Sequence, residues 1–174
     1  MPLPTQQRAE LPPSLLGEGL EPCGELLAVD SYLARRRLDS QLQQQGVLFG
    51  SLEEVVLTQE ELLRPYLENP LVDPEVDKFA ALAAACWASG WVLYVPRNVK
   101  LSRPLHVYSV LSAGKTDIAR TLIVLEEGAE ATVLAETASS DQSAPGLHCG
   151  TVEILVGPRA NLRYVSLQDW GKGV

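Results

Sequence analysis

From residue 91 onward, apolar and polar residues alternate along short segments that are separated by corners rich in glycine, proline, asparagine and alanine. Alternation with a period of two is typical of strands that bury one face. The pattern predicts strands at residues 91–95, 105–111, 117–125, 130–137, 147–156 and 161–168. The second half of the chain is therefore expected to consist almost entirely of β-structure.

The corners between these segments recur at nearly fixed spacing. The aligned positions are Val99, Ala129 and Ala160, and likewise Leu101, Ala131 and Leu162, at offsets of 30 and 31 residues. A period in this range is typical of solenoids, in which each repeat is one coil. Small corner residues let successive coils stack at about 4.8 Å. The repeat therefore favours a β-solenoid, with residues 91–174 as its first coils.

An antiparallel jelly roll is the alternative architecture. It would also place short strands between turns that are rich in glycine and proline. Hairpins of a jelly roll need not preserve the chemistry of their corners, so the repeat favours the solenoid. The pattern alone leaves both architectures open.

Residues 25–90 are expected to form a mainly helical region with two short strands. The predicted strands lie at 26–30 and 47–49, and the predicted helices lie at 38–45, 52–57, 59–68 and 75–89. Gly46 is expected to end the first helix, and the Asn69-Pro70 pair is expected to end the third. Residues 1–24 contain several prolines and glycines, which disfavour regular elements, so we expect a flexible lead-in there.

Two helix starts carry the spacing of a capping box. Ser51 precedes Glu54 by three residues, and Thr58 precedes Glu61 by three. At this spacing each side chain can satisfy a free backbone N–H of the other residue. The helix after Thr58 is expected to bury a stripe formed by Leu62, Leu63, Tyr66 and Leu67.

The three cysteines are far apart in the sequence and form no CxxC pair. Neither a disulfide framework nor a zinc clip is therefore expected. Cys86 belongs to an apolar series with the spacing of one helix face: Phe79, Leu82, Ala83, Cys86, Trp87 and Gly90. This spacing predicts that Cys86 packs in the core.

Composition and charge restrict the kinds of partner that the protein is expected to bind. Lys and Arg number 14 against 22 Asp and Glu, so the net charge of −8 disfavours nucleic acid, and the only basic cluster is Arg35 to Arg37. No apolar run reaches the roughly 20 residues that span a bilayer, and the N-terminus lacks the features of a signal peptide. We expect a cytoplasmic protein without a membrane segment.

His148 and Cys149 are the only adjacent pair of residues that commonly bind transition metals. Neighbours on a strand point to opposite faces, so the two side chains cannot bind one ion without a bulge. His106 lies on another predicted strand and is not expected to reach them. The pair is therefore only a weak candidate metal site, and no catalytic or cofactor-binding residue is predicted.

Two polar clusters could supply catalytic groups, but neither is expected to do so. Glu126, Glu127 and Glu130 lie at a predicted corner, where acidic side chains are ordinarily solvated. The loop that contains Ser139, Ser140, Asp141 and Ser143 lacks the base and the elbow motif that a nucleophilic serine needs.

Arg120 directly precedes an apolar strand segment. A charge in that position often pairs with a carboxylate, here Asp117 or Glu136, and a solvent-facing Arg at a coil edge is the equally open alternative.

Several separated segments, in their order and spacing, resemble the SufB/SufD family of iron–sulfur cluster assembly proteins. They are residues 78–82, 94–99, 103–107, 120–128, 147–154 and 165–170, and residues 25–77 match more loosely. The resemblance implies a helical N-terminal region followed by a right-handed parallel β-helix. It also implies a non-catalytic scaffold subunit of a SufBCD-type complex, whose partners are a SufC-type ABC ATPase and a SufB-type subunit. The cluster would be handled by the full complex, and no cofactor would be bound here.

The resemblance is closer to SufD than to SufB. In SufB a sulfur-accepting cysteine lies on the strand that corresponds to 133–138, and Thr137 occupies that position here. The family continues well beyond the position of Trp170, so the chain resembles an N-terminal fragment that lacks the main partner surfaces. A coil stack cut midway exposes strand edges, and we expect a homo-oligomer through the end coil at 147–168.

Two other classes of function remain open. One is a carbohydrate-active or acyl-transferring β-helix enzyme, which would need acidic residues stacked on one coil face. The repeat places Glu126 and Glu127 over Gly157 and Pro158, so it predicts no such ladder. The other is a stand-alone β-solenoid interaction module.

Overall fold

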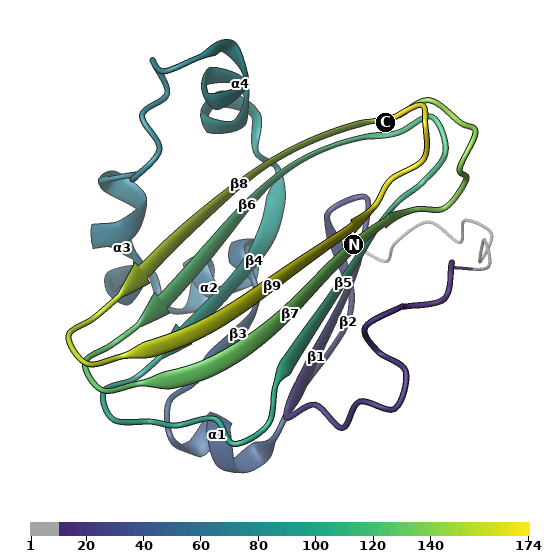
Figure 1. Cartoon of the computed structure of the whole chain (residues 1–174). Helices are drawn as coiled ribbons and strands as arrows, with labels where there is room; N and C mark the ends of the chain where they lie inside the picture. The colour runs from purple at the N-terminus through teal and green to yellow at the C-terminus, as the bar shows by residue number, and fades with distance from the viewer. Residues whose placement is uncertain (1–10) are drawn as a thin grey trace.

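A computed structural model describes residues 11–174 (Figure 1). The strands are β1 (Gly24–Val29), β2 (Tyr32–Leu38), β3 (Leu48–Ser51), β4 (Ser89–Val95), β5 (Leu105–Leu111), β6 (Thr116–Leu125), β7 (Glu130–Ser139), β8 (Leu147–Val156) and β9 (Asn161–Asp169). The helices are α1 (Ser40–Gln44), α2 (Leu52–Thr58), α3 (Glu60–Glu68) and α4 (Lys78–Cys86). In the described part of the chain, none of the helices has the length and apolar character needed to cross a membrane.

The strands form two sheets. Sheet A has the order β2-β1-β5-β7-β9, and sheet B has the order β3-β4-β6-β8. From β4 onward, successive strands alternate between the two sheets, and each pairs in parallel with the strand two places later. Among the strands of residues 11–174, β1 with β2 and β3 with β4 pair in the antiparallel direction. The fold is therefore α/β with mixed sheets, and the antiparallel jelly roll is wrong for β4 to β9.

The register of the parallel pairs reproduces the period of the corners. Ser89 pairs with Ala119, Thr116 with Leu147 and Glu130 with Asn161, at offsets of 30, 31 and 31 residues. The corner before β7 stacks between those at 96–99 and 157–160, because the Asn98 N–H donates to the Glu127 carbonyl and the Gly128 N–H to the Pro158 carbonyl. The predicted alignment of the corners is thus confirmed.

Each corner contains one residue with a left-handed backbone. These residues are Asn98, Gly128 and Arg159, with φ angles of 61°, 70° and 58°. Left-handed φ suits glycine and asparagine, which explains the recurrence of small and polar residues at the corners.

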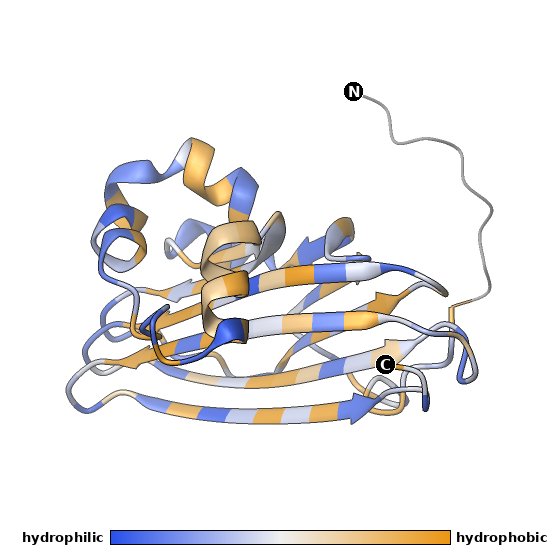
Figure 2. Cartoon of the chain, turned by 90° about the horizontal axis from the view of Figure 1, so that it is seen from above, coloured by the Kyte–Doolittle hydropathy of each residue, from blue (hydrophilic) through white to orange (hydrophobic). Residues whose placement is uncertain are grey.

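The main core lies between the two sheets. Its fully buried side chains include Leu93, Val95, Leu105, Ile123 and Val133. A second core lies on the outer face of sheet B, where α2 and α3 bury Leu52 and Leu63 against Val92, Leu122 and Val124. The alternation of apolar and polar residues along the strands is visible in Figure 2. Sheet B therefore packs apolar side chains on both faces, and α2 and α3 cover its outer face.

The first predicted capping box is confirmed for one of its two hydrogen bonds, while the Glu54 carboxylate pairs with Arg36. The Ser51 hydroxyl accepts a hydrogen bond from the Glu54 N–H at 3.1 Å and caps α2. The second box is wrong, because α2 continues through Thr58, whose hydroxyl donates to the Glu54 carbonyl at 2.9 Å. Helix α3 begins after Gln59 and has no side-chain cap. It ends at Glu68, as the Asn-Pro pair predicts, and it buries Leu63.

Substitution of the cap serine tests this assignment. Ser51→Ala is expected to lower the free energy of unfolding by about 1 kcal/mol, because the Glu54 N–H loses its acceptor. Thr58→Ala is the matched control and is expected to change the free energy of unfolding by less than about 0.5 kcal/mol, since Thr58 caps no helix. Urea unfolding measures both variants. Equal losses would contradict the assignment of Ser51 as the cap.

The predicted buried face of the third long helix is wrong. Helix α4 is shorter than expected, and the chain is already extended from Ser89. Within α4 only Ala83 is buried, whereas Phe79 is 53% exposed and Cys86 is exposed. The physical reason is that α4 is an outer layer that contacts sheet B at β6 and β8 on one side only (Figure 1).

Strand β2 was not predicted from the sequence. It contains the arginines at 35–37 and forms one edge of sheet A. Arg36 pairs with Glu54 at 3.3 Å, and Arg37 pairs with Glu25 at 3.1 Å. Charged residues on an edge strand oppose unwanted pairing with other chains. The basic cluster therefore lies on a sheet edge, where two of its members are neutralised.

Candidate functional site

A cavity with a volume of about 470 Å³ lies between the two sheets. Its walls come from both sheets and from the turn between β1 and β2. The polar residues that line it include Ser31, Ser109, Asp117, Thr137, His148 and Gln168. Apolar residues such as Leu26, Trp91, Val107 and Tyr164 form the remainder. This volume lies in the range of small-molecule sites, and a few polar groups on an apolar wall are typical of them.

An Asp-His pair lies in the wall of the cavity. His148 Nδ1 lies 2.7 Å from Asp117 Oδ1, and the Ser31 hydroxyl donates to Asp117 Oδ2 at 3.0 Å. The imidazole also lies 4.8 Å from the Trp170 ring, centroid to centroid. The hydrogen bond and the aromatic contact fix the orientation of the ring. Within residues 11–174, His148 Nε2 has no protein hydrogen-bond partner, so it is available to a ligand.

His148 and Cys149 face opposite sides of β8, as strand alternation predicts. His148 lies toward the cavity, whereas the Cys149 thiol lies 3.6 Å from the Phe79 carbonyl of α4 and can donate to it. His106 lies elsewhere, with its Nε2 3.6 Å from Glu136 Oε2. In the described range 11–174, no three His, Cys, Asp or Glu side chains gather into a potential metal site. The structure therefore does not bring the two weak metal candidates together.

The expected partners of Arg120 are wrong. Arg120 binds Glu153 through Nε at 2.9 Å and through Nη2 at 2.7 Å. Asp117 is engaged by His148 instead, and Glu136 belongs to sheet A. The 31-residue offset between coils could have predicted that Asp117 lies near His148 and that Arg120 lies near Glu153. It places His148 directly beside Asp117 and places Thr151, two residues before Glu153, beside Arg120.

Glu153 holds the helical part of the chain against sheet B. Its Oε1 accepts hydrogen bonds from the N–H groups of Leu71 and Val72, at 2.8 and 3.3 Å. Arg120 also donates to the Tyr66 carbonyl at 3.4 Å, and its guanidinium lies 5.9 Å from the Trp87 ring. The side chains of Arg120 and Glu153 are only 12% and 2% exposed. These contacts indicate a structural clamp between α3, the following loop and β6–β8.

The acidic corner residues have separate partners. Glu126 accepts hydrogen bonds from the hydroxyls of Tyr66 and Tyr94, at 3.3 and 3.5 Å. Burial, and secondarily the charge of Glu126, raises the pKa of both tyrosines. The other two acids form ion pairs, Glu127 with Arg97 and Arg159, and Glu130 with Lys100. The pairing ties successive corners together, and we infer a structural role for these acids.

The serine-rich loop is organised as a turn. Asp141 accepts hydrogen bonds from the N–H and the hydroxyl of Ser143, at 2.8 and 2.7 Å. The hydrogen bonds from Ser143 lower the pKa of this carboxyl. Ser139 is buried, and its hydroxyl accepts the Gly171 N–H at 3.0 Å. Both side chains thus shape the loop, which is the usual role of Asp and Ser in turns.

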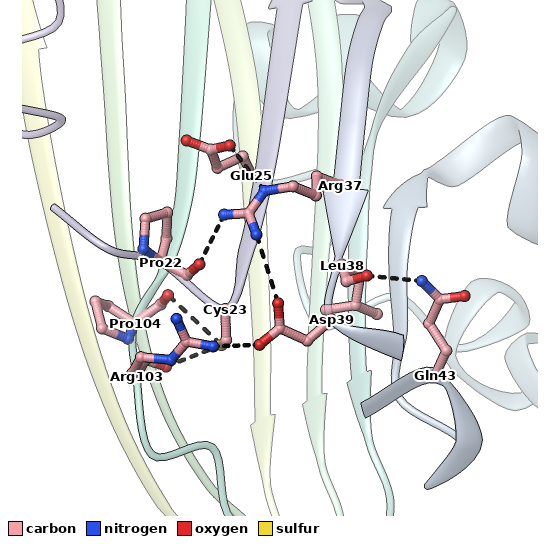
Figure 3. Close-up of polar contacts among 9 residues, drawn as sticks. All are labelled: Pro22, Cys23, Glu25, Arg37, Leu38, Asp39, Gln43, Arg103 and Pro104. Atoms are coloured by element: carbon pink, nitrogen blue, oxygen red, sulfur yellow. Dashed lines mark hydrogen bonds and ion pairs between the residues drawn. The ribbon is translucent and has the colours of Figure 1, made fainter. Parts of the chain in front are cut away.

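Cys23 lies within a polar cluster at the start of β1 (Figure 3). Its thiol donates to the carbonyl of Arg103 at 3.0 Å, and the carbonyl of Pro104 lies at 3.6 Å. Asp39 pairs with Arg103 and, at 3.5 Å, with Arg37. Burial, and then the charge of Asp39, raises the pKa of Cys23. A protonated thiol is a poor nucleophile and a poor metal ligand, so Cys23 is a structural donor that closes this junction.

The burial of the cysteines predicts their order of alkylation. With iodoacetamide at pH 8, Cys86 is expected to react first because it is exposed, whereas Cys23 and Cys149 are buried. Cys23 is expected to react slowly even after transient opening, because its pKa is raised. Peptide mass spectrometry over time measures this order, and the denatured chain serves as the control. Alkylation of Cys23 before Cys86 would contradict the assignment.

Thr137 lies near the C-terminal end of β7 and lines the inter-sheet cavity. Its hydroxyl donates to the Leu167 carbonyl of β9 at 3.4 Å. Thr137 occupies the position that the resemblance relates to a sulfur-accepting cysteine. That position therefore lies at the cavity wall and has a hydroxyl group in this chain.

Comparison with known proteins places this geometry in a family. A family model described as the SufBD protein N-terminal region matches residues 23–107. A second model, described as the SufBD core domain of the SUF system for FeS cluster assembly, matches residues 108–174. The boundary between the two models falls within β5. The two models therefore adjoin inside the sheets rather than at a linker.

Curated relatives agree with these matches. The chain is 35% identical over 147 residues to an iron–sulfur cluster assembly SufBD family protein of Staphylococcus epidermidis, covering 83% of this chain and 31% of that protein. It is 33% identical, with the same coverage, to SufBD family proteins of Staphylococcus haemolyticus and Staphylococcus aureus. The chain thus spans about a third of the length of these relatives. It belongs to the SufBD family of iron–sulfur cluster assembly proteins.

Proposed function

We propose that this chain is a scaffold segment of a Suf complex and performs no catalysis itself. The observation that carries the proposal is the match to the two SufBD models, which are adjacent and together extend over 23–174. The polar clusters support it, since Glu127, Glu130, Glu153 and Asp141 are all used in structural contacts. In this account the strands from β4 onward are the first coils of a right-handed parallel β-helix. The alternation between sheets A and B supports that coil.

We assign the chain to the SufD branch rather than to SufB. Thr137 carries this assignment, because a hydroxyl cannot take up sulfur as a thiolate does. The partners in this proposal are a SufC-type ABC ATPase and a SufB-type subunit in the cytoplasm. They would be bound mainly through parts of the relatives that this chain does not span. The iron–sulfur cluster would be the cargo of the whole complex rather than a cofactor of these residues.

The end coil offers a surface for self-association. Within the described residues, β8 and β9 are the last strands of sheets B and A. Their exposed apolar side chains include Leu147, Val152, Val156 and Val165. A second copy of the chain, paired along these edges, would satisfy their free backbone groups. Size-exclusion chromatography with light scattering is expected to show a dimer or larger species at micromolar concentration, and a monomer would contradict this surface.

A chimera tests the scaffold function in cells. In the chimera this chain replaces the aligned third of the S. epidermidis relative, and the cells are depleted of the native protein. We expect the chimera to restore the activity of iron–sulfur enzymes. A chimera that is expressed and folded but restores no activity would contradict the proposal. A chimera with Glu60→Ala, which changes a side chain that is 63% exposed, is the control and is expected to behave like the unmodified chimera.

A further inference from the structure

The outer face of sheet A contains a buried carboxylate that the scaffold role does not use. Glu136 of β7 is 1% exposed. Its Oε1 accepts the Leu15 N–H at 2.7 Å, and its Oε2 accepts the Ser14 hydroxyl at 2.6 Å and the Leu16 N–H at 3.1 Å. Within residues 11–174, all three donors come from a segment more than a hundred residues away in the sequence. A buried carboxylate is costly unless such bonds satisfy it, so this side chain depends on the segment that covers it.

The covering segment has no helix or strand of its own. Residues 11–22 run over β5 and β7 and are held by polar contacts (Figure 1). Besides the bonds to Glu136, the Tyr108 hydroxyl donates to the Pro12 carbonyl at 2.6 Å. Part of the expected flexible lead-in is thus bound to the sheet in the way that a peptide ligand is bound.

The contacts define what is recognised. The segment offers a hydroxyl, two successive N–H groups and a carbonyl, whereas Leu15 is 59% exposed. Ser14 also accepts the Gly17 N–H at 2.9 Å, and a side chain on Gly17 would meet Ser14 Oγ at 2.7 Å. Recognition therefore needs a hydroxyl residue and a glycine three residues later, and it tolerates change between them.

The outer face of sheet A provides apolar and polar groups around Glu136. Tyr108, Val110 and Ala138 form an apolar cluster on this face. His106 Nε2 lies 3.4 Å from Ser14 Oγ and 3.6 Å from Glu136 Oε2. Burial alone would raise the pKa of Glu136, but the bonds from Ser14, Leu15 and Leu16, with the nearby His106, outweigh it and lower the pKa. The Glu136 carboxylate can thus accept hydrogen bonds from a bound segment, and the face of sheet A around it is apolar.

We propose that this face of β5 and β7 is a peptide-binding site for a Ser/Thr-x-x-Gly turn, occupied in cis by residues 11–17, and that the cis segment can be exchanged for the same peptide in trans. Glu136 is the residue that recognises the turn, and Tyr108 fixes the carbonyl before it. The site has the chemistry to bind residues 11–17 of a second copy of the chain whenever the cis segment leaves.

Hydrogen exchange of the full chain tests the cis occupancy. In the unmodified chain the amides of Leu15 and Leu16 are expected to be protected by about tenfold or more, since each donates to a charged acceptor. Ser14→Ala is expected to remove most of that protection, and Ser14→Thr is expected to keep it. Leu15→Ala is the control and should leave the Leu16 amide protected, because the Leu15 side chain is exposed. Unprotected amides in the unmodified chain would overturn the proposal.

A fluorescent peptide with the sequence of residues 11–20 tests the exchange in trans. The Ser14→Ala chain is expected to bind it about tenfold or more tightly than the unmodified chain, whose own segment competes. A peptide with alanine in place of its serine should not bind either chain. Glu136→Gln in the Ser14→Ala background should abolish binding, because the amide group brings a donor against the peptide's donors. Equal affinity for the two chains, or no binding to the Ser14→Ala chain, would overturn the proposal.

Discussion

Replacement of Glu153 by alanine is expected to lower the free energy of unfolding by about 3–5 kcal/mol, because a buried ion pair would lose one partner. Arg120 would keep its charge beneath the helices with the Tyr66 carbonyl as its remaining acceptor. The N–H groups of Leu71 and Val72 would lose their acceptor at the same time. Since Glu153 is 2% exposed, water cannot readily replace the lost carboxylate.

Urea unfolding, followed by tryptophan fluorescence, measures this loss. Glu60→Ala is the matched control, because Glu60 also pairs with an arginine, Arg64 at 2.8 Å, but is 63% exposed. The control is expected to change the free energy of unfolding by less than about 1 kcal/mol. A Glu153→Ala chain that is as stable as the control would show that the clamp does not hold the helices to sheet B.

Replacement of Gly90 by alanine is expected to lower the free energy of unfolding by about 3 kcal/mol or more. Gly90 has a φ of 150°, which a residue with a side chain rarely adopts, and it pairs with Arg120 in the next coil. A Cβ at this position would overlap the Arg120 carbonyl oxygen, which belongs to the backbone. The expected loss of stability therefore has two parts. One is strain in the backbone at residue 90, and the other is displacement of the neighbouring strand in the core.

Gly114→Ala is the control for Gly90→Ala. Gly114 also has a positive φ, of 70°, but nothing lies within 4 Å of the position that its Cβ would take. Only the conformational cost of about 1–2 kcal/mol is therefore expected for it. Thermal and urea unfolding of both variants separate the two costs. Similar losses at the two glycines would contradict the close approach of β4 to β6.

The coil repeat could be predicted from the sequence because the corners impose strong local requirements. Left-handed positions at Asn98, Gly128 and Arg159 recur once per coil, and small residues such as Ala129 follow them. The predicted strand boundaries at 105–111 and 147–156 agree with the structure.

Elements with weak or mixed patterns could not be predicted in the same way. Strand β2 is an edge strand in which Arg35 to Arg37 replace the usual alternation. The apolar series around Cys86 has helical spacing, but the chain turns into β4 before that series ends. The place of each segment in the tertiary structure thus determines its conformation. The local spacing of apolar residues contains no information about that place.

The candidate site depends on contacts between distant segments. The Asp117–His148 pair follows from the coil offset, once the register is applied to individual side chains. The coil offset does not predict the contact of Ser14 with Glu136, because Ser14 belongs to a segment outside the repeat. Periodicity can therefore find partners within the coils but not those that the N-terminal segment supplies.

A capture experiment with purified components tests the central claim most directly. This chain, the S. epidermidis relative and the chimera of the two are each immobilised and mixed with the SufC-type ATPase and the SufB-type subunit of that organism. We predict that the relative and the chimera retain both partners, and that this chain alone retains them weakly or not at all. Capture by the relative but not by a folded chimera would contradict the assignment of this chain as a scaffold segment of the Suf complex.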